Sequence, residues 1–381
     1  MSAPGADLFG LYVHWPFCLK KCPYCDFNSH VRAAVDHDVW AAALVQELAH
    51  LAARTDRGPL TSIFFGGGTP SLMDPKTVGA VIDRAQSLFT FADDIEITLE
   101  ANPTSADQAR FTGYRAAGVN RVSLGVQSLR DEALQFLGRQ HSVAEAMAAL
   151  TMAQSTFDRV SFDLIYARPD QTVGEWQAEL AEGVALGTDH MSVYQLTIEP
   201  ETEFGKLYQM GRLTPLDDDP AADLYEVTQG MMDDAGMAAY ETSNHARGVQ
   251  NRARHNLTYW QAAPYLGVGP GAHGRVLVNG QKHATIAART PEDWLRRVTD
   301  QGHGFIDWQS LTEQEQAEEA LLMGLRLTDG VLLDRVRPAL DPAALERLID
   351  DGFVEVDDTT LKATKKGHPV LNAVLGALVA G

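Results

Sequence analysis

A regular alternation of short apolar runs and helical patterns over about the first 200 residues constrains the fold of this chain most. Six strand-like runs spaced roughly 30 residues apart predict a parallel sheet with helices packed outside it. Six units are too few to close a barrel of eight strands, so we expect a partial (β/α)6 barrel, with a doubly wound open sheet as the alternative. Asp36, Asp74 and Thr104 are expected to cap three of the helices. The expected strands are residues 11–15, 62–65, 95–99, 121–126, 159–166 and 190–196, and the expected helices are residues 37–53, 75–89, 105–117, 142–156 and 172–186.

The alternating pattern weakens after residue 200, and the chain divides into three expected parts. Residues 1–235 hold the barrel, and residues 236–310 form a connecting α+β region rich in polar, aromatic and glycine residues. Residues 311–381 begin with an acidic helix and end with a helix and a two-strand wing, which predicts a small winged-helix-like domain. Many such domains bind DNA, but this segment has 13 acidic and 7 basic residues within a chain of formal charge −20. We therefore expect no binding to nucleic acid.

All three cysteines, Cys18, Cys22 and Cys25, lie within one short segment. An odd number cannot pair completely, and a secreted scaffold would spread its cysteines through the fold. The N-terminus lacks the pattern of a signal peptide and no stretch approaches the ~18 apolar residues of a membrane span, so we expect a cytoplasmic protein. Three thiolates together are soft ligands, which predicts either an iron–sulfur cluster or zinc with His14 or His30 as a fourth ligand.

Unusual residues stand where the expected strands end, which is where parallel barrels carry their functional groups. The first strand runs into the cysteines, and the second ends in the sequence GGGTPS at residues 66–71. The third ends at Glu100, the fourth at Gln127, and the fifth carries Asp163 in an apolar run. Taken singly, these features also fit a tight turn, a solvated strand end and a structural hydrogen bond. Together on one rim, they predict a shared site in which glycine amides and carboxylates bind a ligand.

The motif CLKKCPYC has the spacing C-x3-C-x2-C and resembles that of the radical SAM enzymes. The segments LYVHWPFC, FFGGGTPS, LEANP, RVSLGVQS and DLIYARPDQT are similar to the coproporphyrinogen-oxidase-like branch of that family, and most similar to its HemW-type haem chaperones. The resemblance covers nearly the whole chain. It implies a [4Fe–4S] cluster held by the three cysteines, whose fourth iron is open to S-adenosylmethionine, and a barrel fold followed by a winged-helix-like segment.

The same resemblance implies which residues line the S-adenosylmethionine site. The chain departs from the family pattern at Ala167 and Arg168, where Gly-Leu is usual. The added charge of Arg168 leaves the contacts around Asp163 undetermined by the resemblance. The implied residues of the S-adenosylmethionine site are Tyr12, Gly67, Gly68, Thr69, Glu100, Gln127, Arg139 and Asp163.

Two functions follow from the resemblance. The first is a haem chaperone that binds haem and passes it to acceptor proteins, and the alternative is an oxygen-independent coproporphyrinogen III oxidase. The oxidases carry a further cysteine where this chain has Phe27 and a longer segment before the cluster, whereas 17 residues precede Cys18 here. Both differences favour the chaperone, so we do not expect an active oxidase.

The sequence HNLTYW at residues 255–260 resembles the chaperones' H-N-x-x-Y-W motif, which implies His255 as a haem ligand. Neutral imidazole is a common axial ligand of haem iron. His255 and its aromatic neighbours would equally suit core packing between domains, and His245 and His273 are competing ligands. Haem propionates need nearby cations, and we expect a cluster of arginines just before His255 to supply them: Arg247, Arg252 and Arg254.

Overall fold

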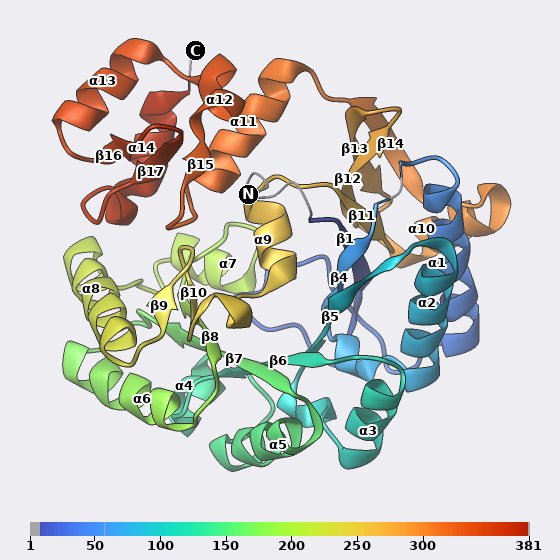
Figure 1. Ribbon diagram of the computed structural model, residues 1–381. Coiled ribbons are helices and arrows are strands. Elements are labelled where there is room, and N and C mark those ends of the chain that lie inside the picture. Colours follow the sequence, from blue (N-terminus) through green and yellow to red (C-terminus); the bar gives the residue numbers. More distant parts are fainter. Residues whose placement is uncertain (1–7, 57, 380–381) are drawn as a thin grey trace.

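The computed structural model describes residues 8–56 and 58–379, with a twelve-stranded mixed sheet at their centre (Figure 1). Six neighbouring strands are parallel and follow one another in sequence order. Because crossovers of one hand then place every helix on the same side, this part of the sheet curves as a partial barrel. A doubly wound sheet would reverse its strand order, so that alternative is wrong and the (β/α)6 prediction is confirmed. These strands are β1 Gly10–Trp15, β4 Leu60–Gly67, β5 Phe91–Ala101, β6 Arg121–Gln127, β7 Arg159–Tyr166 and β8 His190–Gln195.

The connecting helices lie outside the curved sheet (Figure 1). Asp36 and Asp74 cap α1 and α2 as expected, each accepting a backbone N–H bond at the helix start. The prediction for Thr104 is wrong, because it lies in a short 3-10 turn and Asp107 caps α3 instead. The outer helices are α1 His37–Ala52, α2 Pro75–Leu88, α3 Gln108–Ala116, α5 Val143–Thr156, α6 Val173–Ala185, α8 Asp218–Asp234 and α10 Pro291–Gln301. Two short helices, α4 Asp131–Phe136 and α7 Glu203–Gln209, contact each other through Phe136 and Phe204, and α7 lies inside the arc of strands (Figure 1).

Residues after 235 extend both edges of the same sheet. At one edge β11 (Tyr265–Val268) pairs parallel with β1 and continues into three antiparallel strands, and at the other edge β10 pairs with β8. The α+β character predicted for residues 236–310 is confirmed, while the position of the domain boundary stays a prediction. The added strands are β9 Ala238–Ala239, β10 Asn244–Ala246, β12 His273–Val278, β13 Gln281–Ala287 and β14 Phe305–Ser310.

Side chains alternate between the two faces of the barrel strands, as β6 shows. Val122, Leu124 and Val126 are fully buried in the hydrophobic core, where the helices pack against the sheet. Ser123 and Gln127, at the alternate positions, line a cavity on the inner face. The inner face of the barrel is therefore polar, and it is closed partly by α9 (Arg254–Trp260), which Figure 1 shows inside the arc of strands.

The C-terminal segment has its own core and a three-stranded sheet in the order β15-β17-β16. Leu321, Val336, Leu361 and Leu375 are buried in that core and join helices to the wing. This arrangement confirms the predicted winged-helix-like outline. Its elements are α11 Glu313–Gly324, β15 Val331–Leu332, α12 Leu333–Val336, α13 Pro342–Asp350, β16 Val354–Val356, β17 Thr360–Ala363 and α14 Leu371–Leu378.

Among the described residues, every helix falls short of the length and apolar content that a membrane crossing requires.

Candidate cluster and cofactor site

The three cysteines occupy one loop that is fixed at both ends. It leaves β2 (Phe17–Cys18) and returns through β3 (His30–Val31), and these two short strands pair in parallel. A turn between the last two cysteines is closed by the Cys25 backbone N–H, which donates to the Cys22 carbonyl over 3.1 Å. The predicted position of the cysteines, directly after the first barrel strand, is thus what the structure shows.

Two of the three cysteine sulfurs accept a hydrogen bond from the barrel rim, and the third, that of Cys25, lies 3.9 Å from Ser29 Oγ of its own loop. Thr69 Oγ1 donates to the Cys18 sulfur over 3.4 Å, and Arg139 Nη1 donates to the Cys22 sulfur over 3.4 Å. Burial raises the pKa of the Cys18 thiol above its ordinary value. Hydrogen bonds to sulfur favour the thiolate that metal binding requires, and a bound metal offsets the cost of burying it.

The glycine loop after β4 brings backbone next to the cysteines. Gly67 has φ of 112°, a conformation that suits glycine, and a Cβ built on Gly68 would lie 3.0 Å from the Cys18 sulfur and 2.8 Å from the Phe17 carbonyl oxygen. Both positions therefore exclude larger residues. The Gly67 N–H donates to Glu100 Oε2 over 3.3 Å, which ties this loop to the end of β5.

Two carboxylic acids stand next to each other on the inner face. Burial, with the nearby charge of Asp163 as a lesser cause, raises the pKa of Glu100 to about 8. Burial also raises the pKa of Asp163 to about 6, and Ser123 Oγ donates to Asp163 over 3.5 Å. The charges of Arg121 and Arg139 lower the pKa of Asp163 only in part, and Glu100 is held mostly protonated at neutral pH. A ligand ammonium or sulfonium would restore their ionised forms.

Arg139 supplies the positive charge of the site. Its Nη2 donates to the Gly125 carbonyl over 3.0 Å, while its Nε is buried without a hydrogen-bond partner. Among the described residues no carboxylate forms an ion pair with Arg139. A buried donor without a partner is costly, so this guanidinium is suited to a ligand carboxylate.

One cavity of about 150 Å³ brings together the cysteines and seven of the predicted cofactor residues. Tyr12 and His255 are the two predicted residues outside its walls. Ser123, Asn102 and Lys21 also line it and were missed. Strand alternation would have indicated Ser123, which lies two residues from Gly125 on the inner face. The seven predicted residues are Gly67, Gly68, Thr69, Glu100, Gln127, Arg139 and Asp163.

Tyr12 lines an adjoining cavity together with Gly67 and Glu100. Its hydroxyl lies 2.8 Å from His14 Nδ1, and the other ring nitrogen of His14 lies 2.9 Å from the Asn28 carbonyl oxygen. His14 therefore has no free nitrogen for a metal ion. His30 Nε2 likewise lies 3.2 Å from the Asn28 side-chain oxygen. His14 is thus engaged at both ring nitrogens, and His30 at Nε2.

His255, the predicted haem ligand, is fully buried on the inner side of the sheet. Its Nδ1 lies 2.9 Å from Ser62 Oγ, and its Nε2 lies 2.8 Å from the Tyr259 hydroxyl. Its ring stacks on Phe64 with a centroid separation of 5.0 Å, and its backbone N–H donates to Glu96. Neither ring nitrogen is open to a ligand in this conformation. Ligation of haem by His255 stays a prediction, and it would require the ring to leave this position.

The competing histidines differ in access. His245, on β10, is fully buried in the sheet, whereas His273, at the start of β12, is exposed and lines the cavity next to Tyr12. An exposed imidazole can reach a ligand without rearrangement of the core.

The arginines expected to bind propionates are already paired. Arg247 forms an ion pair with Asp189, Arg252 with Asp329, and Arg254 with Asp94. These pairs fasten the segment before α9 to the rest of the barrel. The structure thus gives the three arginines exposed carboxylate partners within the chain, and their role in binding haem propionates stays a prediction.

The departure from the family pattern at residues 167 and 168 is accommodated away from the cofactor cavity. Ala167 has φ of 55°, a conformation in which glycine is usual. Arg168 turns toward α6, where its Nη2 lies 2.5 Å from Glu179 Oε2, and its Nη1 donates to the Ile165 carbonyl and to Ser128 Oγ. Its charge is therefore neutralised by a buried carboxylate rather than directed at Asp163.

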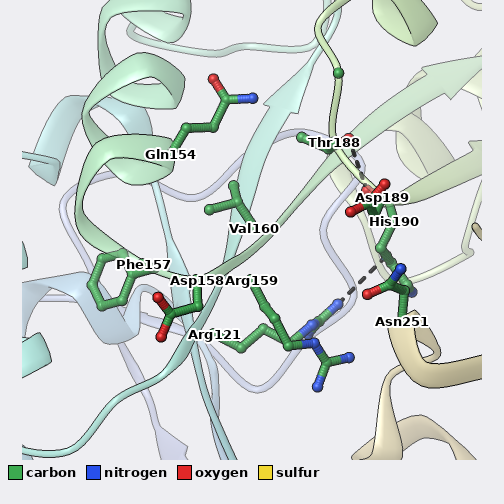
Figure 2. A pocket seen from close by; sticks show the side chains of 11 residues that line it. Arg121, Gln154, Phe157, Asp158, Arg159, Val160, Thr188, Asp189, His190 and Asn251 are labelled. Atoms are coloured by element: carbon green, nitrogen blue, oxygen red, sulfur yellow. Dashed lines mark hydrogen bonds between the residues drawn. The ribbon is translucent and has the colours of Figure 1, made fainter.

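A further cavity, drawn in Figure 2, is lined by residues at the opposite, N-terminal ends of the barrel strands. Arg121 and Arg159 begin β6 and β7 there, and His190 begins β8. Arg121 Nη2 lies 3.4 Å from His190 Nδ1, and Arg159 forms a 2.7 Å ion pair with Glu96. Residues at this end of α/β barrels support stability rather than chemistry. We therefore assign this polar layer to the structure of the barrel.

Known proteins resemble this chain over nearly its whole length. Residues 12–181 match the model of the radical SAM superfamily, and residues 311–370 match that of the HemN C-terminal domain. The chain is 36% identical to the heme chaperone HemW of Escherichia coli over 97% of this chain and 98% of that protein. The chain is a radical SAM protein of the HemW type.

Other relatives extend this family to mitochondria and to a solved structure. The HemW-type chain is 40% identical to the mitochondrial radical S-adenosyl methionine domain-containing protein 1 of Bos taurus, over 99% of this chain and 88% of that protein. The structure of coproporphyrinogen III oxidase HemN from Escherichia coli superposes with a TM-score of 0.80 at 22% identity, covering 97% of this chain and 89% of that one. At that identity the likeness shows a shared fold.

Proposed function

We propose that this HemW-type protein is a haem chaperone, which binds haem and delivers it to acceptor proteins. The observation that carries the proposal is the 36% identity to the heme chaperone HemW of Escherichia coli along nearly the whole of both chains. Three free cysteines fit a reducing compartment, and we propose the cytoplasm.

The cofactor part of the proposal is a [4Fe–4S] cluster and S-adenosylmethionine in the cavity of the cysteines. Cys18, Cys22 and Cys25 would hold the cluster, which when bound supplies an electron for reductive cleavage of a sulfonium. The buried Nε of Arg139 fits a ligand carboxylate, and Glu100 with Asp163 fits an ammonium or hydroxyl groups. These side chains bind and orient the ligand and leave little room for water.

The alternative function is an oxygen-independent coproporphyrinogen III oxidase, which the fold shared with HemN supports. Phe27 is a difference with a physical consequence, because its exposed ring lines the cavities on both sides of Glu100. An apolar ring there cannot donate a proton as a cysteine thiol could. This position therefore favours the chaperone over the oxidase.

The test uses full-length protein whose cluster has been reconstituted without oxygen. It is incubated with coproporphyrinogen III, S-adenosylmethionine and a chemical reductant, and the porphyrin products are separated by chromatography. We expect no protoporphyrinogen, while parallel samples given haem acquire a protein-bound haem spectrum. Production of protoporphyrinogen at many turnovers per chain would assign the protein to the oxidases instead.

A further inference from the structure

The cavity that adjoins the cysteine site is lined largely by aromatic rings, and we call it the tyrosine cavity. Its walls include Tyr12, Tyr259 and Tyr265 together with His14 and His273, and its volume is about 290 Å³. It shares Phe27, Gly67 and Glu100 with the cavity of the cysteines. A ligand in the tyrosine cavity would therefore lie directly beside the proposed cluster and S-adenosylmethionine.

The walls of the tyrosine cavity suit a flat apolar ring system. Tyr259 and Tyr265 meet edge to face with centroids 4.7 Å apart, and Tyr12 stacks on Phe64 at 6.3 Å, so the rings are held in place by one another. Burial raises the pKa of Tyr265 to about 12 and that of Tyr12 further still. The phenols of both residues are therefore neutral, and they serve as packing surface and hydrogen-bond donors rather than as phenolate ligands of a metal.

Of the two histidines in these walls, only His273 can bind a metal without rearrangement. Both ring nitrogens of His14 lie within hydrogen-bond distance of other groups. His273 is exposed, and no hydrogen bond to its ring occurs within residues 8–56 and 58–379. Although the residue is exposed overall, partial burial of its ring lowers the pKa of His273, with Arg275 and Arg289 as lesser causes. It is therefore neutral at physiological pH, and neutral imidazole is the form that binds iron.

A cation for a propionate lies next to this histidine. Arg275 is committed to Glu319 at 2.5 Å, and Arg32 is committed to Glu292 at 2.5 Å. Arg289 is exposed, and its carbonyl oxygen accepts a 2.9 Å hydrogen bond from Nδ2 of Asn28, which lines the tyrosine cavity. The charge of Arg289 also contributes to the lowered pKa of His273. Within the described part of the chain Arg289 has no carboxylate in an ion pair, so its guanidinium is available to an anionic ligand.

We propose that haem binds in the tyrosine cavity, with His273 as an axial ligand of the iron and Arg289 paired with a propionate. This inference rests on the proposed haem-chaperone function and names the site that performs it. It differs from ligation by His255, because His255 remains in the core and supports the cavity from behind through its 2.8 Å contact with the Tyr259 hydroxyl. Haem would then be in contact with Phe27 and next to the cysteine loop.

The test is a titration of the reconstituted full chain with haem, followed by the Soret band, in wild type and in His273→Ala. We expect the wild type to bind haem, and His273→Ala to bind at least about tenfold more weakly with a shifted Soret band. Addition of free imidazole to His273→Ala should restore the wild-type band position, because the cavity itself is intact. His283→Ala is the matched control, since His283 lies on the neighbouring strand β13 outside the cavity.

The outcomes separate the two proposals. If wild type binds haem and His273→Ala has the same affinity and spectrum, the site proposed here is wrong while the chaperone function stands. If wild type itself does not bind haem, the proposed function fails and this inference fails with it. Arg289→Gln should weaken binding about tenfold without moving the Soret band, whereas the exposed, ion-paired Arg296→Gln should change neither. Equal effects of these two substitutions on haem affinity would show that Arg289 does not pair with a propionate.

Discussion

Arg139 donates a hydrogen bond from Nη1 to the sulfur of Cys22 over 3.4 Å, while its buried Nε has no partner. One side chain thus contacts a proposed cluster ligand and presents a free donor to the same cavity. The two groups of Arg139 have different consequences. The Nη1 hydrogen bond acts on a sulfur that iron would hold, whereas the free Nε–H can donate to a ligand carboxylate.

Replacement of Arg139 by glutamine should therefore weaken S-adenosylmethionine binding more than it affects the cluster. Loss of a charge-assisted hydrogen bond predicts a cost of roughly 1–3 kcal/mol in binding free energy. The affinity is measured by calorimetry on anaerobically reconstituted protein, and iron and sulfide are assayed on the same samples. Arg115→Gln is a suitable control, since Arg115 forms an exposed ion pair with Asp158. Unchanged affinity in Arg139→Gln would show that the cofactor carboxylate binds elsewhere.

Replacement of any single cysteine by serine should abolish most of the cluster. A hydroxyl at Cys18, Cys22 or Cys25 is a poor replacement for a thiolate bound to iron, so we expect the content to fall from about four irons and four sulfides per chain to a small fraction. The measurement is the iron and labile sulfide assay together with visible absorbance. Stoichiometric zinc without sulfide in the wild type would contradict the assignment of the cysteines.

The two acids of the site predict an unusual dependence of stability on pH. Glu100 has a pKa of about 8 in the folded protein, against roughly 4.3 for an unfolded chain. Between these values the unfolded chain is ionised while the folded site holds its proton, so the folded state binds more protons. The free energy of unfolding of the ligand-free protein should therefore fall as pH rises through this window, by up to about 1.4 kcal/mol per pH unit.

Urea unfolding of the ligand-free protein between about pH 5 and pH 8 measures this dependence. In Glu100→Gln the slope should be smaller, and the variant should be more stable than the wild type near the upper end of the range. The exposed Glu355→Gln is the control and should follow the wild type. Parallel curves for wild type and Glu100→Gln would mean that Glu100 is ionised in the folded protein throughout.

The ion pair between Arg168 and Glu179 should be important for stability. Arg168→Ala leaves the buried Glu179 without its cation, and we expect a loss of about 3–5 kcal/mol in the free energy of unfolding. Arg130→Ala breaks an exposed ion pair with Glu182, which lies on α6 like Glu179, and should cost under about 1 kcal/mol in the free energy of unfolding. Similar small losses for both substitutions would indicate that Arg168 reaches water.

Strand and helix positions could be predicted from the sequence because each barrel strand is a short segment rich in apolar, β-branched and aromatic residues and each crossover carries a helical pattern. The cofactor residues Glu100, Gln127 and Asp163 could be placed together because parallel strands end on one rim. Asp107 was missed as a helix cap because Thr104, three residues earlier, has an equally suitable side chain.

The surroundings of His255 and of the three arginines could not be predicted from local sequence. His255 contacts Ser62 and Phe64, which are almost 200 residues away. Those contacts form because β11 pairs with β1 in the sheet. The local sequence HNLTYW does not predict this long-range pairing. Likewise Arg254 meets Asp94 only because α9 folds back inside the arc of strands.

The central claim is that this chain carries haem, and the most direct measurement is the stoichiometry and transfer of bound haem. Reconstituted protein is saturated with haem, separated from free haem by gel filtration, and mixed with an apoprotein that has a higher affinity for haem. We predict about one haem per chain after gel filtration, and a shift of the Soret band to that of the acceptor on mixing. If haem elutes apart from the protein, or if binding does not saturate as the haem concentration rises, the claim that this chain carries haem is contradicted.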